Sequence, residues 1–259
     1  MNSYIKEEFK RAFFSKITLF TSIFSIVLVF GGMFEYISWI KYGDISVLYL
    51  FLSGYNSGTA NFLIVVFPII SCLPFAASYV SDCKTGLNKY IYIRMSKTSY
   101  RWIRLLVNGL VGGFVLFIGP FISLLFLLGI KVFTHIPMAK EQMETFEYFK
   151  SLGIHSPIIA ILIILIVLFF CGFTFATFAL GISTFIQNIY LAVLLPFIYY
   201  IFSATVLINI HTYLNAVVLY DVNHFGVNFA QRCLYGIILC MVGIITFFIG
   251  GYKVEQKNT

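Results

Sequence analysis

Long apolar stretches alternate with short polar segments along almost the whole chain. A helix needs about 20 apolar residues to cross the hydrocarbon core of a bilayer. Stretches of about this length or more cover residues 17–35, 61–81, 105–130, 158–186, 190–208 and 234–252. Lipid offers backbone amides no hydrogen-bond partners, so such stretches form helices. The pattern predicts an all-α integral membrane protein with six transmembrane helices.

Two further segments have shorter patterns. Residues 1–16 are amphipathic, because Ile5, Phe9 and Phe13 share one helical face while charged residues occupy the other. This predicts an N-terminal amphipathic interfacial helix, and a simple positive anchor remains an alternative. Residues 45–52 are apolar but too short to span, and the polar sequence SGYNSG follows them. We expect an interfacial or re-entrant piece there.

Composition supports the membrane assignment. Of the 259 residues, 60% are hydrophobic and 10% are charged, whereas a soluble domain typically has about 25% charged residues. The polar surface is too small to cover a body that faces water on all sides. Since the apolar stretches occupy nearly the whole chain, residues 1–259 are expected to form one transmembrane domain.

Basic residues are distributed unevenly between the two predicted sides. With six spans, the termini and the loops after the second and fourth spans share one side, which holds 12 of the 17 Lys and Arg residues. Cytoplasmic segments of membrane proteins carry an excess of these residues. Both termini are therefore predicted to be cytoplasmic. The net charge of +7 reflects this bias, and acidic lipid rather than nucleic acid is the expected counter-charge.

The predicted cytoplasmic loop 82–104 is the most distinctive polar segment. It carries six basic groups, and Leu87, Ile91 and Met95 recur at helical spacing. We expect a short amphipathic helix, a turn at 96–99 and a second helix that Ser99 caps. Two roles are open for this loop. It could receive a push from a partner protein, or it could anchor the chain to anionic lipid.

Two segments on the opposite side also carry polar residues. Residues 135–156 include Glu141, Glu144, Glu147 and Lys150 and predict a short solvated helix. Residues 209–232 are amphipathic, and part of this segment, 214–219, is apolar enough to dip back into the membrane. An ordinary interfacial loop with an aromatic belt is the alternative for 209–232.

The chain lacks the sequence motifs of common catalytic sites. It has no G-x-x-x-x-G-K-[ST], G-x-S-x-G, H-E-x-x-H or CxxC motif, and residues 151–220 contain no Asp, Glu, Lys or Arg. Ion-coupled pumps place ionisable groups inside the membrane. No catalytic or metal-binding residue is therefore predicted, and an intramembrane enzyme is disfavoured. If the chain moves a cargo, energy is expected to come from another protein.

Small residues recur at four-residue spacing within two predicted spans. Gly109 and Gly113 form a GxxxG pair, and Gly172, Ala176, Thr177 and Gly181 give similar pairs. Such pairs allow helices to approach closely. Packing within the chain is favoured over a dimer interface.

The order of these features resembles the permease subunits of ABC-2-type transporters, especially those of low-GC Gram-positive bacteria. An amphipathic N-terminus and two spans precede a D-x-x-x-G segment, an apolar helix and an Arg-x-Ser turn. The matching positions are Asp82, Gly86, Ile91, Arg94, Ser96, Tyr100 and Arg104. Lys is common in the family where Arg104 stands.

The resemblance implies partners and site residues. Cytoplasmic ABC ATPase subunits would bind ATP and Mg, and this chain would need no cofactor. The N-terminal helix, through Ile5, Phe9 and Phe13, and the loop would contact the ATPase. The implied coupling residues are Asp82, Gly86, Leu87, Lys89, Tyr90, Ile91, Arg94, Met95 and Ser96. Re-entrant helices between spans five and six would close an outer gate at Leu219, Tyr220, Asp221 and Phe225. A second permease, identical or homologous, would complete the pathway.

The sequence thus predicts a permease subunit of an ATP-driven exporter in the bacterial plasma membrane, without an ATPase site of its own. Its aromatic content of 19% and uncharged spans favour a peptide or another amphipathic or hydrophobic cargo. The alternative is a non-transporting immunity or sensing component that binds an extracellular peptide. In that case the segments 135–156 and 209–232 would matter more than the loop 82–104.

Overall fold

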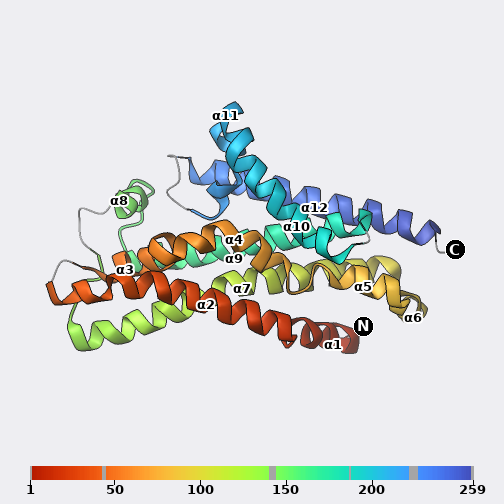
Figure 1. The fold of residues 1–259 in the computed structure, drawn as a ribbon, viewed down its shortest axis with the longest axis horizontal. Coiled ribbons are helices and arrows are strands. Elements are labelled where there is room, and N and C mark those ends of the chain that lie inside the picture. The colour runs from red at the N-terminus through yellow and green to blue at the C-terminus, as the bar shows by residue number, and fades with distance from the viewer. Residues whose placement is uncertain (1, 43–44, 140–143, 187, 222–226, 258–259) are drawn as a thin grey trace.

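A computed structural model describes residues 2–42, 45–139, 144–186, 188–221 and 227–257 (Figure 1). Every regular element in these ranges is helical, which confirms the all-α prediction for this part of the chain. Five stretches of the described chain are long and apolar enough to cross a membrane. They contain α2 (Lys16–Ile37), α7 (Lys97–Thr134), α9 (Pro157–Phe185), α10 (Ile189–Phe202) and α12 (Phe229–Lys257).

A sixth candidate span consists of two helices that meet at a bend, and its limits differ from the predicted ones. Helices α3 (Val47–Asn56) and α4 (Asn61–Cys72) meet at an angle of 42° and together are long and apolar enough to span. The predicted single helix over 61–81 is wrong, because α4 ends at Cys72 and Pro74 follows in the turn. Proline lacks the backbone N–H that a continuing helix needs.

Residues 45–52, expected to be an interfacial or re-entrant piece, belong mainly to α3, whose side chains pack in the core with α2 and α7. The SGYN sequence misled the prediction because it is helical here. A Cβ atom added at Gly54 would lie 3.2 Å from the Val29 carbonyl oxygen, so this glycine permits close approach to α2. The small residues therefore serve packing, and the break comes later, at Gly58 with φ +54°.

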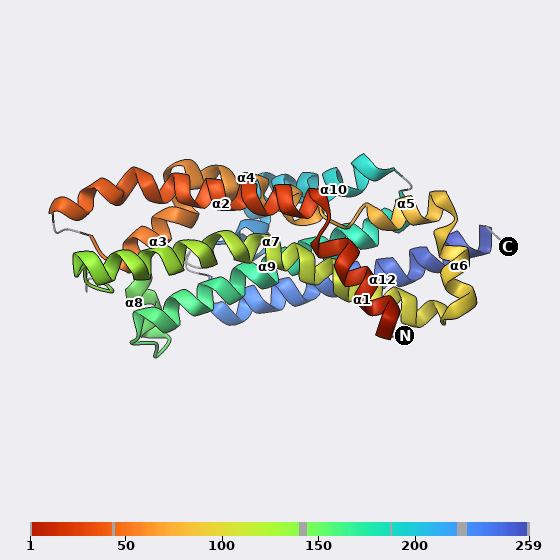
Figure 2. The same ribbon diagram turned by 90° about the horizontal axis from the view of Figure 1, so that it is seen from below.

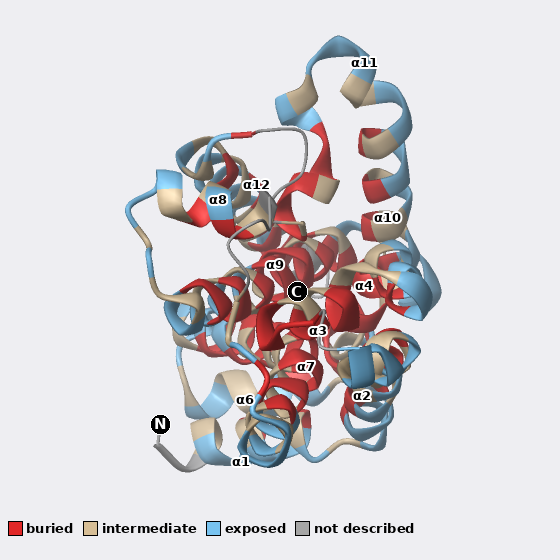
Figure 3. Cartoon of the chain, turned by 90° about the vertical axis from the view of Figure 1, so that its left-hand side faces the viewer, coloured by how far each residue is buried: buried red, intermediate tan, exposed pale blue. Residues whose placement is uncertain are grey.

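Helix α9 lies at the centre of the bundle. It packs against α7 on one side and α12 on the other, and also against α4 and α10. Figure 3 shows buried residues gathered on the inner faces of these helices, with exposed residues facing outward. Those outward faces carry many large apolar side chains, as expected for helices solvated by lipid.

The small residues mark seams inside the chain, as predicted. A Cβ atom added at Gly112 of α7 would lie 3.0 Å from the Gly172 carbonyl oxygen of α9 and would clash with the Ala176 side chain. Likewise, a Cβ atom at Gly243 of α12 would lie 2.8 Å from the Phe178 backbone of α9. The three central helices are therefore held at near backbone contact.

Both ends of the chain lie toward one end of the elongated bundle, called here the terminal end (Figures 1 and 2). Helices α1 (Asn2–Phe13), α5 (Ser78–Thr85) and α6 (Leu87–Arg94) lie there too, and Figure 2 shows α1 crossing the bundle obliquely. The opposite end, called the far end, carries α8 (Glu144–Ser151). The short solvated helix expected within 135–156 thus forms, but Phe146 and Phe149 of α8 are buried against the core.

Candidate functional site

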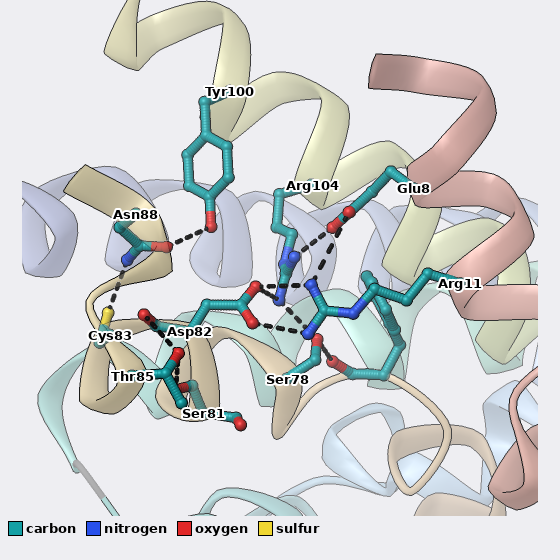
Figure 4. Close-up of polar contacts among 11 residues, drawn as sticks. Glu8, Arg11, Ser78, Ser81, Asp82, Cys83, Thr85, Asn88, Tyr100 and Arg104 are labelled. Atoms are coloured by element: carbon teal, nitrogen blue, oxygen red, sulfur yellow. Dashed lines mark hydrogen bonds and ion pairs between the residues drawn. The ribbon is translucent and has the colours of Figure 1, made fainter. Parts of the chain in front are cut away.

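Helix α1 is fixed to the terminal end by an apolar face and a charged face. Ile5, Phe9 and Phe13 pack against a buried cluster that includes Ile103 and Val107 of α7. This confirms the amphipathic pattern predicted for the segment. On another face of α1, Glu8 and Arg11 point toward α5 and α7 (Figure 4).

These two residues meet Asp82 and Arg104 in a cluster of four charges, called here the charge cluster. Arg11 donates two hydrogen bonds to the Asp82 carboxylate, at 2.6 and 3.0 Å. Arg104 forms ion pairs with Asp82, with Nη2 to Oδ2 at 2.7 Å, and with Glu8. Arg104 Nη2 also donates to the Ser78 hydroxyl at 2.8 Å. These hydrogen bonds and ion pairs join three helices that are distant in sequence, α1, α5 and α7.

The charge cluster is neutral in sum and largely closed to solvent. Arg104 has no exposed side-chain surface, and Asp82 and Glu8 have 2% and 4%. Arg11 is 40% exposed, and its hydrogen bonds to Asp82 raise its pKa. Burial and the negative charge of Glu8 raise the pKa of the nearby Tyr4. Removing one partner from such a buried group of ion pairs typically destabilises a protein by about 3–5 kcal/mol. The charge cluster therefore holds α1, α5 and α7 together.

A second polar chain ties α6 to α7. Gly86, with φ +74°, makes the left-handed turn between α5 and α6. The Tyr100 hydroxyl donates to Asn88 Oδ1 at 2.9 Å, and Asn88 Nδ2 donates to Cys83 Sγ at 2.9 Å. Burial raises the pKa of the Cys83 thiol. The turn between α5 and α6 is therefore anchored to the first turn of α7.

The outward face of α6 carries apolar and basic side chains together. Tyr90 and Ile93 are 71% and 83% exposed, and Leu87, Lys89 and Arg94 are exposed too. Ile91 and Met95, by contrast, pack inward near Tyr79 and Tyr100. This outward face (Leu87, Lys89, Tyr90, Ile93 and Arg94) is called the α6 face.

The predicted coupling residues thus fall into two groups. Leu87, Lys89, Tyr90, Arg94 and Ser96 are exposed. Gly86, Ile91 and Met95 are half-buried, and Asp82 is buried in the charge cluster. The apolar stripe expected at Leu87, Ile91 and Met95 is therefore split between two surfaces, and Ile93 is the most exposed apolar residue of α6.

The order expected within 82–104, a short helix, a turn and a second helix, forms as α6, a break at Met95 and Ser96, and the start of α7. Helix α7 begins at Lys97, and Ser96 caps it by accepting a hydrogen bond from the Ser99 backbone N–H at 3.3 Å. The predicted cap at Ser99 is thus three residues late. Because α7 runs unbroken to Thr134, α6 is joined through a short break to a helix that crosses the whole bundle.

The predicted outer-gate residues are only partly described. Leu219 and Tyr220 are buried at the end of η5 (Ala216–Leu219), Asp221 is half-buried, and Phe225 lies outside the described residues. The Tyr220 hydroxyl donates to the Tyr55 carbonyl at 3.0 Å, and its ring stacks on Phe67 at 5.0 Å. The segment therefore folds back onto α3 and α4 through short turns.

Sequence reasoning missed the part that Glu8 and Arg11 play. A signal was present, because Tyr4, Glu8 and Arg11 share a helical face at spacings of four and three. Asp82 is also the only acidic residue between Asp44 and Glu141. An isolated acid among many bases indicates a paired group, although the pairing itself spans 71 residues of sequence.

No three His, Cys, Asp or Glu residues of the described ranges lie together in a way that could hold a metal ion. Comparison of the chain with protein-family models, with curated proteins and with solved structures returns no match.

Proposed function

We propose that this chain is the permease subunit of an ATP-driven ABC-2-type exporter and that the α6 face docks a separate ATPase. The observation that carries the proposal is an exposed face of mixed apolar and basic side chains on α6, a helix anchored to α7. Tyr90 and Ile93 would enter a partner's apolar groove while Lys89 and Arg94 meet acidic groups at its rim. Such a face lies beyond the apolar spans, where a soluble partner can reach it.

The anchoring of α6 supports a mechanical role. A push on α6 reaches α7 through Asn88 and Tyr100, which are joined by a buried hydrogen bond. It reaches α1 through Asp82 and Arg11, because Asp82 lies on the helix just before α6. Arg101, one turn before Arg104, lies 4.2 Å from the centre of the Tyr252 ring and adds a contact to α12. The terminal end can therefore move as one body and tilt the spans.

The distribution of charge supports an external energy source. Residues 151–220, which cover α9 and α10, contain no ionisable Asp, Glu, Lys or Arg. Proton-driven transporters place such groups along their pathway. Hydrolysis of ATP with Mg by the partner would supply the work, and two permease chains would enclose a peptide or another amphipathic cargo. The basic terminal end would face the cytoplasm of a bacterial cell.

The test uses the full chain, purified in mild detergent from cells that also express the candidate ATPase. We expect ATPase to co-purify and its Mg-dependent ATP hydrolysis to depend on the permease. The double variant Lys89→Glu/Arg94→Glu and the single variant Ile93→Glu each should lower the co-purified ATPase about tenfold or more.

The matched control is Val132→Glu/Phe133→Glu, which alters an exposed apolar pair at the far end of α7. This control should leave co-purification unchanged. If the α6 variants retain the ATPase at the wild-type level, the docking proposal is wrong. If those variants lose the ATPase but keep the protein's activity in cells, the result favours the immunity or sensing alternative.

A further inference from the structure

The bent span formed by α3 and α4 lacks a helical hydrogen bond at its bend. In a continuous helix the Thr59 N–H would donate to the Tyr55 carbonyl oxygen, four residues earlier. Here the Thr59 N–H donates to the Glu35 carboxylate of α2 at 2.9 Å, and the Thr59 hydroxyl donates to the same oxygen. The Tyr55 carbonyl oxygen instead accepts a hydrogen bond from the Tyr220 hydroxyl at 3.0 Å. Two side chains from other segments thus take the places of the two ends of one backbone bond.

Tyrosine side chains hold the span on both sides of the break. The Tyr220 hydroxyl bonds the end of α3, while its ring stacks on Phe67 of α4 with the ring centres 5.0 Å apart. A second tyrosine, Tyr200 of α10, donates to the Ile64 carbonyl oxygen at 2.8 Å. This carbonyl is open to Tyr200 because Pro68 lacks the N–H that would bond it within the helix. The angle between α3 and α4 is therefore fixed by α10 and by the segment that ends at Tyr220.

The covalent chain permits α3 and α4 to join into one helix. Residues 57–60 are Ser, Gly, Thr and Ala, so no proline blocks a continuous helix there. Gly58 has φ +54° in the bend, and glycine can also adopt helical angles. The continuous helix would pair the Thr59 N–H with the Tyr55 carbonyl oxygen. Both arrangements thus satisfy the same two backbone groups, which is what a two-state element requires.

We propose that the α3–α4 span is a two-state switch, bent while Glu35 and Tyr220 hold its open backbone groups and continuous when they release them. Glu35 is exposed, so water can replace its bonds to Thr59. Displacement of the segment that ends at Tyr220 would free the Tyr55 carbonyl. An unpaired carbonyl is costly inside a membrane, so this release favours the continuous helix. The inference does not depend on the proposed transport function, since both states belong to the isolated chain.

The test is hydrogen exchange at residues 57–60, measured by mass spectrometry on the full chain in detergent. Gly58→Ala favours the continuous state, because an added Cβ would clash with the Glu35 carboxylate and because alanine disfavours positive φ and favours helix. Tyr220→Phe keeps the aromatic ring and removes the donor to the Tyr55 carbonyl. In the double variant Gly58→Ala/Tyr220→Phe we expect exchange at 57–60, corrected for intrinsic rates, to slow about tenfold or more, because helical amides are protected.

The sign of the change separates a switch from a weakened bend, since a variant that only loosens the bend would exchange faster at 57–60. Gly153→Ala is the matched glycine control, because Gly153 also has a positive φ, +81°, and lies far from the bend in sequence. Tyr235→Phe is the matched tyrosine control, because its hydroxyl bonds Tyr199 and the Leu214 carbonyl, outside the bent span. Both controls should change exchange at 57–60 less than about twofold.

Gly58→Ala alone decides the question if the double variant does not fold, with an expected slowing of about threefold. Unchanged or faster exchange at residues 57–60 in the folded Gly58→Ala variant or the folded double variant would overturn the proposal.

Discussion

Arg104 carries its positive charge at a position closed to solvent, and it can do so because Asp82 and Glu8 surround it. Asp82 is the centre of this arrangement, since it pairs with Arg104 and Arg11 at once. Asp82→Asn removes one negative charge and leaves two guanidinium groups facing a neutral amide. We expect the free energy of unfolding to fall by about 3 kcal/mol, measured by SDS titration of the detergent-solubilised protein.

The controls for this prediction come from the same site. Lys84→Gln, on the exposed side of α5, should change the free energy of unfolding by less than about 0.5 kcal/mol. The double variant Arg11→Gln/Asp82→Asn keeps the site neutral and should be at least about 1 kcal/mol more stable than the sum of the single changes predicts. Strict additivity would mean that Arg11 and Asp82 do not stabilise each other.

Cys83 gives a pH-dependent readout of the same region. Burial raises the pKa of its thiol, so less of it is thiolate near neutral pH, and the thiolate is the reactive form. We expect maleimide to label Cys83 several times more slowly at pH 7 than a cysteine introduced by Lys84→Cys, on an exposed neighbouring position. As pH rises, the rate at Cys83 should keep increasing after the exposed site has levelled off. Equal rates and equal pH profiles would contradict a raised pKa of the half-buried Cys83 thiol.

At the level of the elements, the α7–α9 seam depends on the absence of side chains at Gly112 of α7 and Gly172 of α9. A methyl group at Gly112 would meet Ala176 and the Ser71 carbonyl, and neither the backbone nor a short side chain can move aside cheaply. Gly112→Ala should therefore lower the free energy of unfolding by about 1–3 kcal/mol. Gly129 lies on the same helix with nothing within 4 Å of an added Cβ atom. Gly129→Ala should be neutral or slightly stabilising, because alanine favours helix more than glycine does.

Hydrophobic patterning predicts most helices here but not how they are interrupted. The long apolar runs of α9 and of residues 234–252 in α12 are easy to recognise because they contain no Asp, Glu, Lys or Arg. In contrast, Ser53, Gly54 and Asn56 of α3 look like a loop in sequence, since small and polar residues also serve close packing. The cap at Ser96 and not Ser99 depends on one hydrogen bond, which pattern alone does not distinguish.

The candidate site is even harder to predict from sequence than the helix boundaries are. Exposure of Tyr90 and Lys89 could be expected from a short amphipathic helix, and both are exposed. The burial of Asp82 could not, because its partners lie on α1 and on α7. Long-range ion pairs leave no periodic signal in a sequence. Arg232 likewise counted only toward the charge bias, and its buried position depends on how α12 packs against α9.

For the molecule as a whole, the terminal end carries most of the basic residues, the charge cluster and the α6 face on one side of the spans. An ATPase can use that side only if it faces the cytoplasm. In a variant whose five native cysteines are replaced by serine, a cysteine from Lys84→Cys marks the terminal end and one from Phe133→Cys marks the far end. Phe133 is 86% exposed, and Lys84 is exposed too.

We expect a membrane-impermeant maleimide to label Phe133→Cys in intact cells and Lys84→Cys only after the membrane is opened. The reason is electrostatic, since the excess of Lys and Arg at the terminal end opposes its translocation. Labelling of both sites after permeabilisation serves as the control for accessibility. If Lys84→Cys reacts in intact cells, the terminal end faces outward and no cytoplasmic ATPase could reach α6. The charge cluster would then only stabilise the fold and would have no part in coupling to an ATPase.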